Sequence, residues 1–262
     1  MPSVVNISDD DLLWRYLDLS YDSAYKNLAL EEALARKTES GEFVPTVRFW
    51  TNVPAVVLGR FQDAELEVDL DLCESRRVQV ARRFTGGGAV FHDEGTLNLT
   101  IITKPTHGLS LARLYQMNAQ LILDSLDDLD LECSFSPPNS ILVNGKKISG
   151  AAAALGARYT LWHASILIST NTRLLEEALA PSRHMFQTRF VRSQWKPVTT
   201  IVKELDGNVD AKKLRSHLVE SFTSRTCAKL TSGALSKDEE NALQDLLPKY
   251  SSMQWNLHGE SF

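Results

Sequence analysis

The chain has 262 residues, 43% of them hydrophobic, which is enough to bury a sizeable core in one domain spanning residues 1–262. Its 28 basic and 33 acidic residues give a net charge of −5, which argues against a nucleic-acid-binding protein. Three cysteines at irregular spacings form neither a disulfide framework nor a zinc motif. Because no stretch resembles a secretion signal or approaches about 20 uninterrupted apolar residues, we expect a cytoplasmic protein without membrane contact.

The first half of the chain alternates between predicted helix and predicted strand. Apolar residues recur at helical spacing from Ser23 to Lys37, and Gly41 follows where a helix would end. The runs Thr46–Trp50 and Ala55–Gly59 favour strands and are separated by a short turn, so we expect them to be neighbours in a sheet. Further strands are predicted at residues 78–83, 88–92 and 97–103, and an amphipathic helix at residues 111–126.

The second half begins with the signal for a tight hairpin. Asn144-Gly145 lies between two apolar runs, and both residues tolerate the positive φ that a two-residue turn requires. Residues 159–169 alternate between the two faces of a strand, which places His163 and Ser165 on the same face. Two helices follow, one capped by Asp210 and running to about Thr223, the other opened by a capping box at Ser236–Glu239 and ending near Leu247. These elements predict an α+β fold with mixed, largely antiparallel sheets and flanking helices.

The most unusual local feature is the glycine run Gly86–Gly88, which follows Arg82-Arg83 at the end of a predicted strand. Glycines leave backbone N–H groups accessible, and a guanidinium binds phosphate or carboxylate oxygens, so the segment suits an anionic ligand. It matches neither the P-loop nor the dinucleotide-binding glycine pattern. A glycine-rich hairpin with solvated arginines is an equally good interpretation of this segment alone.

A second candidate segment places Lys147 beside a run of small residues, Gly150–Ala154. Small side chains permit the close approach of a ligand, to which the lysine would offer a compact cation. On this segment alone, solvated lysines at a turn and an alanine run packed within a helix are the better interpretation.

The remaining candidates carry weaker signals. His163 on a strand is more often a packing residue than a catalyst, and the histidines show no metal-ligand spacing. Cys133 could be a nucleophile, although most free cysteines are small core residues. The alternating acids from Asp63 to Asp71 predict a solvated face, with Leu66, Val68 and Leu70 turned inward.

In this order, the segments resemble the lipoate-protein ligase family, which shares its fold with biotin-protein ligases and octanoyl transferases. The arginine–glycine segment is the most specific part of the resemblance, which extends through most of the chain. Its parts are NLALEE (27–32), RFWTNVPAVVLGRFQ (48–62), RRFTGGGAVFHDEGTLNLT (82–100), GKKISGAA (145–152), LWHASIL (161–167) and the closing residues 249–256.

The resemblance implies a two-step reaction. Lipoate and ATP would give lipoyl-AMP and pyrophosphate, and the lipoyl group would then pass to a lysine of a lipoyl domain. Lys147 would be the catalytic residue, first contacting the carboxylate and then the mixed anhydride. The resemblance places the following residues at the substrate and nucleotide: Arg82, Arg83, Gly86, Gly87, Gly88, Ala89, Val90, Phe91, His92, Asn98, Lys147, Ser149, Gly150, Ala151 and His163.

The resemblance also implies partners and a metal. The expected acceptor is a lipoyl domain of a 2-oxo acid dehydrogenase or the glycine-cleavage H protein. Mg²⁺ is expected with ATP, and Asp93 is the candidate ligand. Trp50, Val57, Leu58 and the run Ala151–Ala154 are candidate walls for the acyl tail. Many ligases of this family carry a C-terminal accessory domain, for which we find no counterpart after Asn256, so a separate accessory polypeptide is expected.

Two alternatives belong to other functional classes. A related octanoyl transferase would use an upstream cysteine as acyl carrier, and Cys133 lies 14 positions before Lys147. A non-catalytic protein could keep a lipoate or adenylate pocket without turnover. The segment SFSPPNSILVNGKK around the hairpin is closer to a ligase, so the ligase is the favoured hypothesis.

Overall fold

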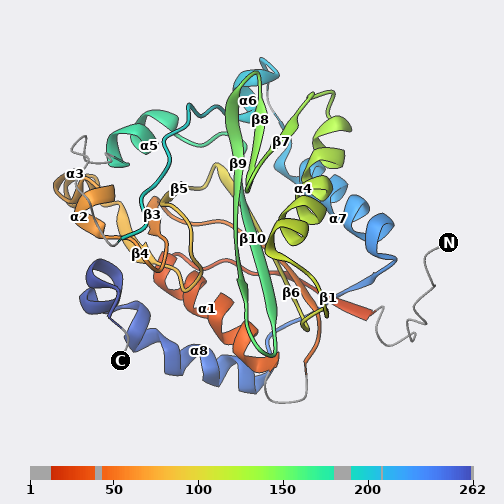
Figure 1. Ribbon diagram of the computed structural model, residues 1–262, viewed down its shortest axis with the longest axis horizontal. Helices are drawn as coiled ribbons and strands as arrows, with labels where there is room; N and C mark the ends of the chain where they lie inside the picture. Colours follow the sequence, from red (N-terminus) through yellow and green to blue (C-terminus); the bar gives the residue numbers. More distant parts are fainter. Residues whose placement is uncertain (1–12, 39–42, 180–189, 208, 261–262) are drawn as a thin grey trace.

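The computed structural model describes residues 13–38, 43–179, 190–207 and 209–260. Its strands form an eight-stranded sheet, in the order β11-β1-β2-β6-β10-β9-β8-β7, and a three-stranded sheet, in the order β4-β3-β5 (Figure 1). The strands are β1 (Leu13–Asp18), β2 (Thr46–Trp50), β3 (Ala55–Leu58), β4 (Gln79–Arg82), β5 (Val90–His92), β6 (Thr96–Thr103), β7 (Ser134–Ser136), β8 (Ser140–Val143), β9 (Lys146–Leu155), β10 (Thr160–Leu167) and β11 (Lys229–Ser232). The helices are α1 (Ala24–Lys37), α2 (Ala64–Glu67), α3 (Leu70–Ser75), α4 (Leu111–Asp127), α5 (Thr172–Ala178), α6 (Ile201–Glu204), α7 (Ala211–Thr226) and α8 (Lys237–Tyr250), with a π-helical turn at Gln254–His258.

The large sheet is mixed, as predicted. β1 runs parallel to both β11 and β2, whereas the pairs from β2 through β6, β10, β9 and β8 to β7 are antiparallel. In the small sheet, β3 is parallel to β4 and antiparallel to β5. The α+β prediction with largely antiparallel sheets is therefore confirmed.

The expectation that Thr46–Trp50 and Ala55–Gly59 are neighbouring strands is wrong, because β2 and β3 lie in different sheets. The turn between them is drawn toward α1. Asn27 of α1 donates from Nδ2 to the Thr51 carbonyl, at 3.2 Å, and to Asn52 Oδ1, at 2.7 Å. The chain therefore leaves the large sheet at this turn and begins the small one.

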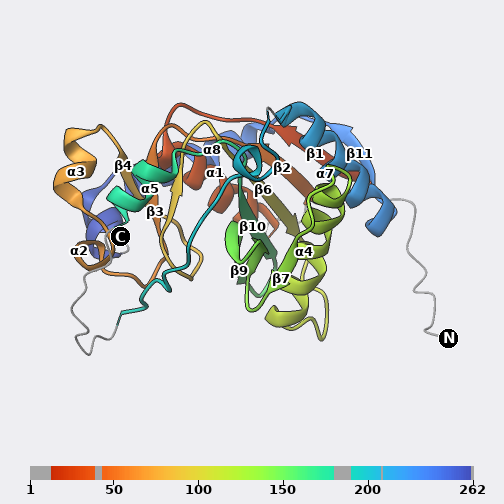
Figure 2. The same cartoon turned by 90° about the horizontal axis from the view of Figure 1, so that it is seen from above.

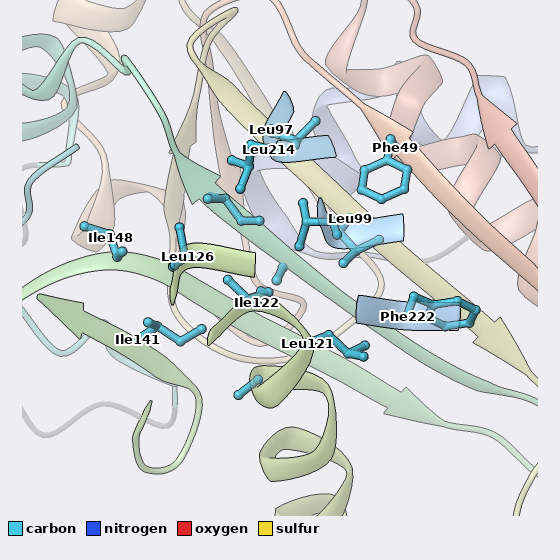
Figure 3. Packing of buried hydrophobic residues seen from close by; sticks show 14 of the residues in the cluster. Phe49, Leu97, Leu99, Leu121, Ile122, Leu126, Ile141, Ile148, Leu214 and Phe222 are labelled. Carbon is cyan, nitrogen blue, oxygen red and sulfur yellow. The ribbon is translucent and has the colours of Figure 1, made fainter. Parts of the chain in front are cut away.

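Two helix pairs cover the faces of the large sheet (Figure 2). On one face, Leu121 and Ile122 of α4 and Phe222 of α7 pack with Phe49 and Leu99 of the sheet (Figure 3). On the other face, apolar residues of α1 and α8 pack with residues of β1, β2, β6 and β10. The small sheet lies beside this second layer, so a cavity can form where the two sheets meet. None of the described helices has the length and apolar character needed to cross a membrane.

Local signals placed most elements correctly. Ser23 and Asp210 cap α1 and α7 through their side chains, and the capping box opens α8 as predicted. Asn144 and Gly145 turn between β8 and β9 with φ of 49° and 74°. The alanine run, however, lies in β9 and not in a helix.

The acidic stretch is also different from its prediction. It forms two short helices capped by Asp63 and Asp69, and the carboxylate of Glu67 is buried where a solvated face was expected.

Candidate active site

A cavity of about 320 Å³ lies where the two sheets face one another. Its walls come from β2, β6, β9 and β10 of the large sheet, β3 and β5 of the small sheet, α1, the glycine loop and residues 191–196. The segment 191–196 is held there by the residues after it. Lys147 N–H donates to the Pro197 carbonyl, at 2.8 Å, and Thr199 N–H donates to the Lys147 carbonyl, at 3.0 Å.

One cross-strand row forms much of the cavity floor. Trp50, Asn98, Ser165 and Gly150 are register partners across β2, β6, β10 and β9. Residues opposite one another in neighbouring strands present their side chains to the same face of a sheet. The sheet therefore brings four residues from distant parts of the sequence to one side of the cavity.

Arg83 holds the glycine loop in shape. Its buried guanidinium donates to the carbonyls of Val57, Gly86 and Gly88, at 3.0, 2.7 and 2.8 Å, and to Thr85 Oγ1, at 3.0 Å. Burial lowers the pKa of Arg83 to about 10. The alternative of a hairpin with solvated arginines is therefore wrong. Because the Arg83 guanidinium already donates to these oxygens, the groups that the loop offers to an anion are chiefly its backbone N–H groups.

The glycine loop requires glycine at Gly87, within the loop, and at Gly59, which packs against it. Gly87 has a φ of 93°, a conformation that other residues rarely adopt. A Cβ on Gly59 would lie 2.0 Å from the Gly87 carbonyl oxygen. The loop therefore packs backbone against backbone, which leaves its outer side open to the cavity.

Arg82 points away from the cavity and supports the fold. Its buried guanidinium donates to the carbonyls of Gly59, Gln62, Trp255 and Leu257, at distances of 2.6 to 3.0 Å. Burial lowers its pKa to about 10. Arg82 thus joins the π-helical turn to the base of the glycine loop and does not line the cavity.

Lys147 has no acidic partner among the described residues, and, unlike the other cavity cations, its side chain has no hydrogen-bond acceptor there either. A Cβ added at Gly150 would lie only 2.5 Å from Lys147 Nζ, so the side chain folds back over Gly150. Burial, aided by Lys196 and Arg83, lowers the pKa of Lys147 to about 8. The ammonium is therefore a desolvated charge that an anion would stabilise.

The charged side chains that line the described cavity are all positive. Arg83, Lys147, Arg192 and Lys196 line it, and no aspartate or glutamate does so in the described part of the chain. Arg192 pairs with the buried Glu67 outside the lining, at 2.7 Å. Such a concentration of positive charge favours an anionic ligand.

The two histidines that line the cavity, His92 and His163, belong to hydrogen-bonded networks. His163 lies between Glu31 of α1, at 3.0 Å from Nδ1, and Thr85 of the glycine loop, at 2.9 Å from Nε2. His92 lies between Asn52 and Ser165, at 3.1 and 2.7 Å. Burial, with Arg83 nearby, lowers the pKa of His92 to about 3, so this imidazole is neutral.

The structure brings many of the predicted site residues together. The cavity lining includes Arg83, Gly87, Gly88, Ala89, Val90, His92, Asn98, Lys147, Gly150, Ala151 and His163, with Trp50, Val57 and Ala152 from the candidate walls. The predicted residues outside the lining are Arg82, Gly86, Phe91, Ser149, Asp93, Leu58, Ala153 and Ala154. Phe91 is turned the other way on β5 and packs in a core cluster.

Asp93, the candidate metal ligand, braces a loop. Its carboxylate accepts hydrogen bonds from Gly95 N, at 3.0 Å, Thr96 Oγ1, at 3.2 Å, and Asn171 N, at 2.8 Å. Among the described residues, no group of three His, Cys, Asp or Glu side chains could hold a metal ion. Asp93 therefore has a structural role that its sequence context did not indicate.

Several residues that line the cavity could not be predicted from the sequence. Leu28 lies on α1 one turn from Glu31, within a segment that had been noted only as part of the family resemblance. Ser193 is the clearest case, since its Oγ accepts from Ala89 N, at 2.9 Å, and from Gln62 Nε2, at 3.0 Å. No local pattern indicates a contact between residues about a hundred positions apart.

Comparison with known proteins agrees with this architecture. The family model described as the lipoyl protein ligase A/B catalytic domain matches residues 23–223. The lipoate-protein ligase A subunit 1 of Thermoplasma acidophilum is 29% identical over 242 residues, covering 88% of this chain and 91% of the relative. An octanoyltransferase LipM of Moorella thermoacetica is 26% identical over 265 residues, covering 92% of this chain and 97% of the relative.

Solved structures are similarly close. One describes a bipartite lipoate protein ligase and its E2 lipoyl domain from Thermoplasma acidophilum, with a TM-score of 0.84, 28% identity and coverage of 96% and 98% of the two chains. Another, a lipoate-protein ligase A bound with ATP, has a TM-score of 0.82, 29% identity and coverage of 95% and 100%. The family match includes the three-stranded sheet, the large sheet except β1 and β11, and every residue that lines the cavity. The chain belongs to the lipoyl protein ligase A/B catalytic-domain family.

Proposed function

We propose that this protein activates lipoate with ATP and transfers the lipoyl group to a lysine of a lipoyl domain. The observation that carries the proposal is the position of Lys147, an unpaired ammonium between the glycine loop and an apolar recess. An acid with an apolar tail would place its carboxylate at this charge. The phosphates of a nucleotide would then meet the glycine loop and the other cavity cations.

The recess suits an acyl chain. Leu28, Trp50 and Val57 line it and are almost fully buried. Pockets for small ligands are mostly apolar with few polar groups that fix orientation. Lys147, Arg192 and Lys196 are only half-buried, and Gln194 and Pro138 of the same lining are exposed, so these cations lie toward the opening, whereas Arg83 is buried. This polarity orients an amphipathic acid with its tail inward.

In the first step, a lipoate carboxylate oxygen attacks the α-phosphorus of ATP and pyrophosphate leaves, which forms lipoyl-AMP. In the second, the uncharged ε-amine of the acceptor lysine attacks the acyl carbonyl, AMP leaves, and the nitrogen loses one proton to solvent as the amide forms. Both steps develop negative charge near Lys147, and a preorganised donor at such a place lowers the barrier by about 3 kcal/mol. Lys147 must be protonated for this role, which its pKa of about 8 allows at neutral pH.

Mg²⁺ usually accompanies ATP through the phosphate oxygens and a few carboxylates. The described cavity offers no carboxylate, and the Asp93 oxygens already accept three hydrogen bonds. These residues do not form a protein site for the metal, so we derive no step through it.

The name and coverage of the Thermoplasma relative support a two-polypeptide system. That relative is called subunit 1, and a solved structure from the same organism is described as a bipartite lipoate protein ligase and its E2 lipoyl domain. We therefore propose that activation by this chain requires a separate accessory polypeptide, that the acceptor is a lipoyl domain, and that the protein acts in the cytoplasm.

The cysteine-dependent octanoyl transferase is the less favoured function. Cys133 is half-buried against the core and does not line the cavity. Burial, with Glu204 nearby, raises the pKa of its thiol to about 12, whereas an acyl carrier must become a thiolate.

The proposal is tested by intact-mass spectrometry of a lipoyl domain incubated with this protein and either synthetic lipoyl-AMP or lipoate with ATP. Modification by lipoyl-AMP alone is the expected result in the absence of an accessory polypeptide. Lys147→Met should abolish it, whereas Lys146→Met should retain it, because Lys146 is exposed on the neighbouring position of β9. No modification with lipoyl-AMP would refute the proposed function.

A further inference from the structure

The cavity wall contains one buried amide group without a hydrogen-bond partner. Asn98 is 1% exposed and lines the cavity. Its Oδ1 accepts from Ser165 Oγ, at 2.9 Å, but its Nδ2 finds no acceptor among the described residues. A buried donor in this state has lost its hydrogen bonds to water and gained none in the protein, so its position calls for a physical explanation.

The orientation of this amide is fixed by a relay that begins at Arg48. Arg48 Nη2, at 2.7 Å, and the Tyr21 N–H, at 3.0 Å, both donate to Asn27 Oδ1. Because both groups can only donate, Asn27 must present its oxygen to them. Its Nδ2 then donates to Asn52 Oδ1, which leaves Asn52 Nδ2 to face His92 Nδ1 at 3.1 Å.

The relay continues in one direction to the cavity. Since His92 is neutral and its Nδ1 accepts from Asn52, its proton lies on Nε2, which donates to Ser165 Oγ at 2.7 Å. The single proton of Ser165 is therefore given to Asn98 Oδ1. A flipped Asn98 would leave Ser165 without an acceptor. Asn98 therefore joins the relay only through its oxygen, and the two N–H donors of its Nδ2 find no acceptor in the relay.

The cross-strand row gives the distance from this donor to Lys147. Gly150, under the Lys147 ammonium, and Asn98 are separated by Ser165 in the row, which is two strand spacings or about 10 Å. An eight-carbon acyl chain with carbon–carbon bonds of about 1.5 Å is about 9 Å long when extended. A carboxylate held at Lys147 would therefore place the far end of such a chain beside Asn98, next to Trp50.

We infer that Asn98 is a specificity-determining residue, which donates from Nδ2 to a sulfur of the lipoyl dithiolane ring and thereby favours lipoate over octanoate. The inference rests on the proposed function and names the acyl chain that the site prefers. The divalent sulfur of a dithiolane, like that of methionine, is a weak acceptor, whereas the terminal methyl of octanoate accepts nothing. Octanoate would leave the buried donor unsatisfied, and a site with an unsatisfied polar group discriminates against the ligand that causes it.

The test compares lipoate with octanoate in the same protein, with the cognate accessory polypeptide present. Wild type should show a higher kcat/KM for lipoate, and Asn98→Leu should lower the lipoate-to-octanoate ratio by about three- to tenfold. This is near the low end of the effect of an unsatisfied buried donor, because sulfur is a weak acceptor. A ratio within one variant cancels losses of active protein. Ser165→Ala, which removes the donor that orients Asn98, should lower the ratio in the same direction.

Asn139→Leu is the matched control. Asn139 also lines the cavity, but its Nδ2 already donates to the Ala151 carbonyl at 2.6 Å. Its replacement should change kcat/KM for both acids alike and leave the ratio unaltered. Thermal shifts with lipoate or octanoate alone provide a second readout, which needs neither ATP nor an acceptor.

The outcomes separate the two proposals. A wild-type protein that transfers both acyl groups, with a ratio changed less than twofold in Asn98→Leu and Ser165→Ala, would overturn the role of Asn98 and leave the proposed function intact. A protein that neither binds these acids nor transfers from lipoyl-AMP would overturn the proposed function itself.

Discussion

Replacing Lys147 with methionine should stabilise the unliganded protein and abolish acyl transfer. The lysine holds a charge in a buried position beside Arg83 and Lys196, which lowers its pKa from 10.5 to about 8. A pKa change of that size corresponds to about 3 kcal/mol. Allowing for partial solvent access, we expect Lys147→Met to raise the free energy of unfolding by about 2 kcal/mol at pH 7, because methionine removes the charge and fits an apolar wall.

The sign of the pH dependence follows from the direction of this shift. Below about pH 8, Lys147 is protonated in both folded and unfolded chains, and the folded state carries the full penalty. Between about pH 8 and 10.5, only the unfolded chain binds the proton, so the contribution of this residue to stability rises with pH. The stability advantage of Lys147→Met should therefore shrink across that range and vanish above it.

Urea unfolding of wild type, Lys147→Met and Lys146→Met at pH 7 and pH 10 measures this difference. Lys146 is exposed and lies 3.8 Å from Glu204, so its replacement should change stability by less than about 0.5 kcal/mol. A Lys147→Met protein that is less stable than wild type at pH 7, or a gap that does not narrow with pH, would refute the account of an unpaired buried cation.

Three further changes test other parts of the site. Gly150→Ala should lower the rate of acyl transfer by about a hundredfold while far-UV circular dichroism stays unchanged, because the new Cβ would displace Lys147 Nζ, which lies 2.5 Å from that position; wild-type turnover would contradict this geometry. Cys133→Ser should retain full transfer in the mass-spectrometric assay, since the thiol does not line the cavity; a tenfold loss would revive the thioester route. Arg82→Met should destabilise the fold by about 3–5 kcal/mol in thermal unfolding, because several buried carbonyls lose their donor; unchanged stability with weaker ATP binding would instead make Arg82 a nucleotide contact.

The elements that could be predicted from sequence are those whose signals are local. Ser236 and Glu239 are three positions apart and cap each other's backbone, so the start of α8 is written in four residues. The Asn144-Gly145 turn is equally local. By contrast, the parallel pairing of β1 with β11 joins Trp14 to Leu230, and nothing near either residue specifies the other.

The same difference between local and long-range signals applies to the individual residues of the site. The glycine loop and Lys147 could be chosen because their residue types suit an anion. The roles of the adjacent Arg82 and Arg83 could not be separated, since successive residues of a strand face opposite sides and only the packed sheets decide which side is the cavity. Asp93 was predicted as a metal ligand for the same reason, because its neighbours in the fold could not be known from the sequence. In the structure the backbone N–H of the distant Asn171 donates to one of its carboxylate oxygens.

The charges of the cavity also explain why Lys147 is the residue on which ligand binding should depend most. Arg83 donates to backbone carbonyls of β3 and of its own loop, and Arg192 has the carboxylate of Glu67. Lys196 donates to the hydroxyls of serines on β7 and β8. Among the described residues, Lys147 has neither a carbonyl nor a carboxylate as a partner, so an incoming anion would stabilise a charge that the fold has left desolvated. Binding should therefore raise the pKa of Lys147 toward its ordinary value, and the free energy gained in this way is available only to a ligand that brings negative charge to Gly150.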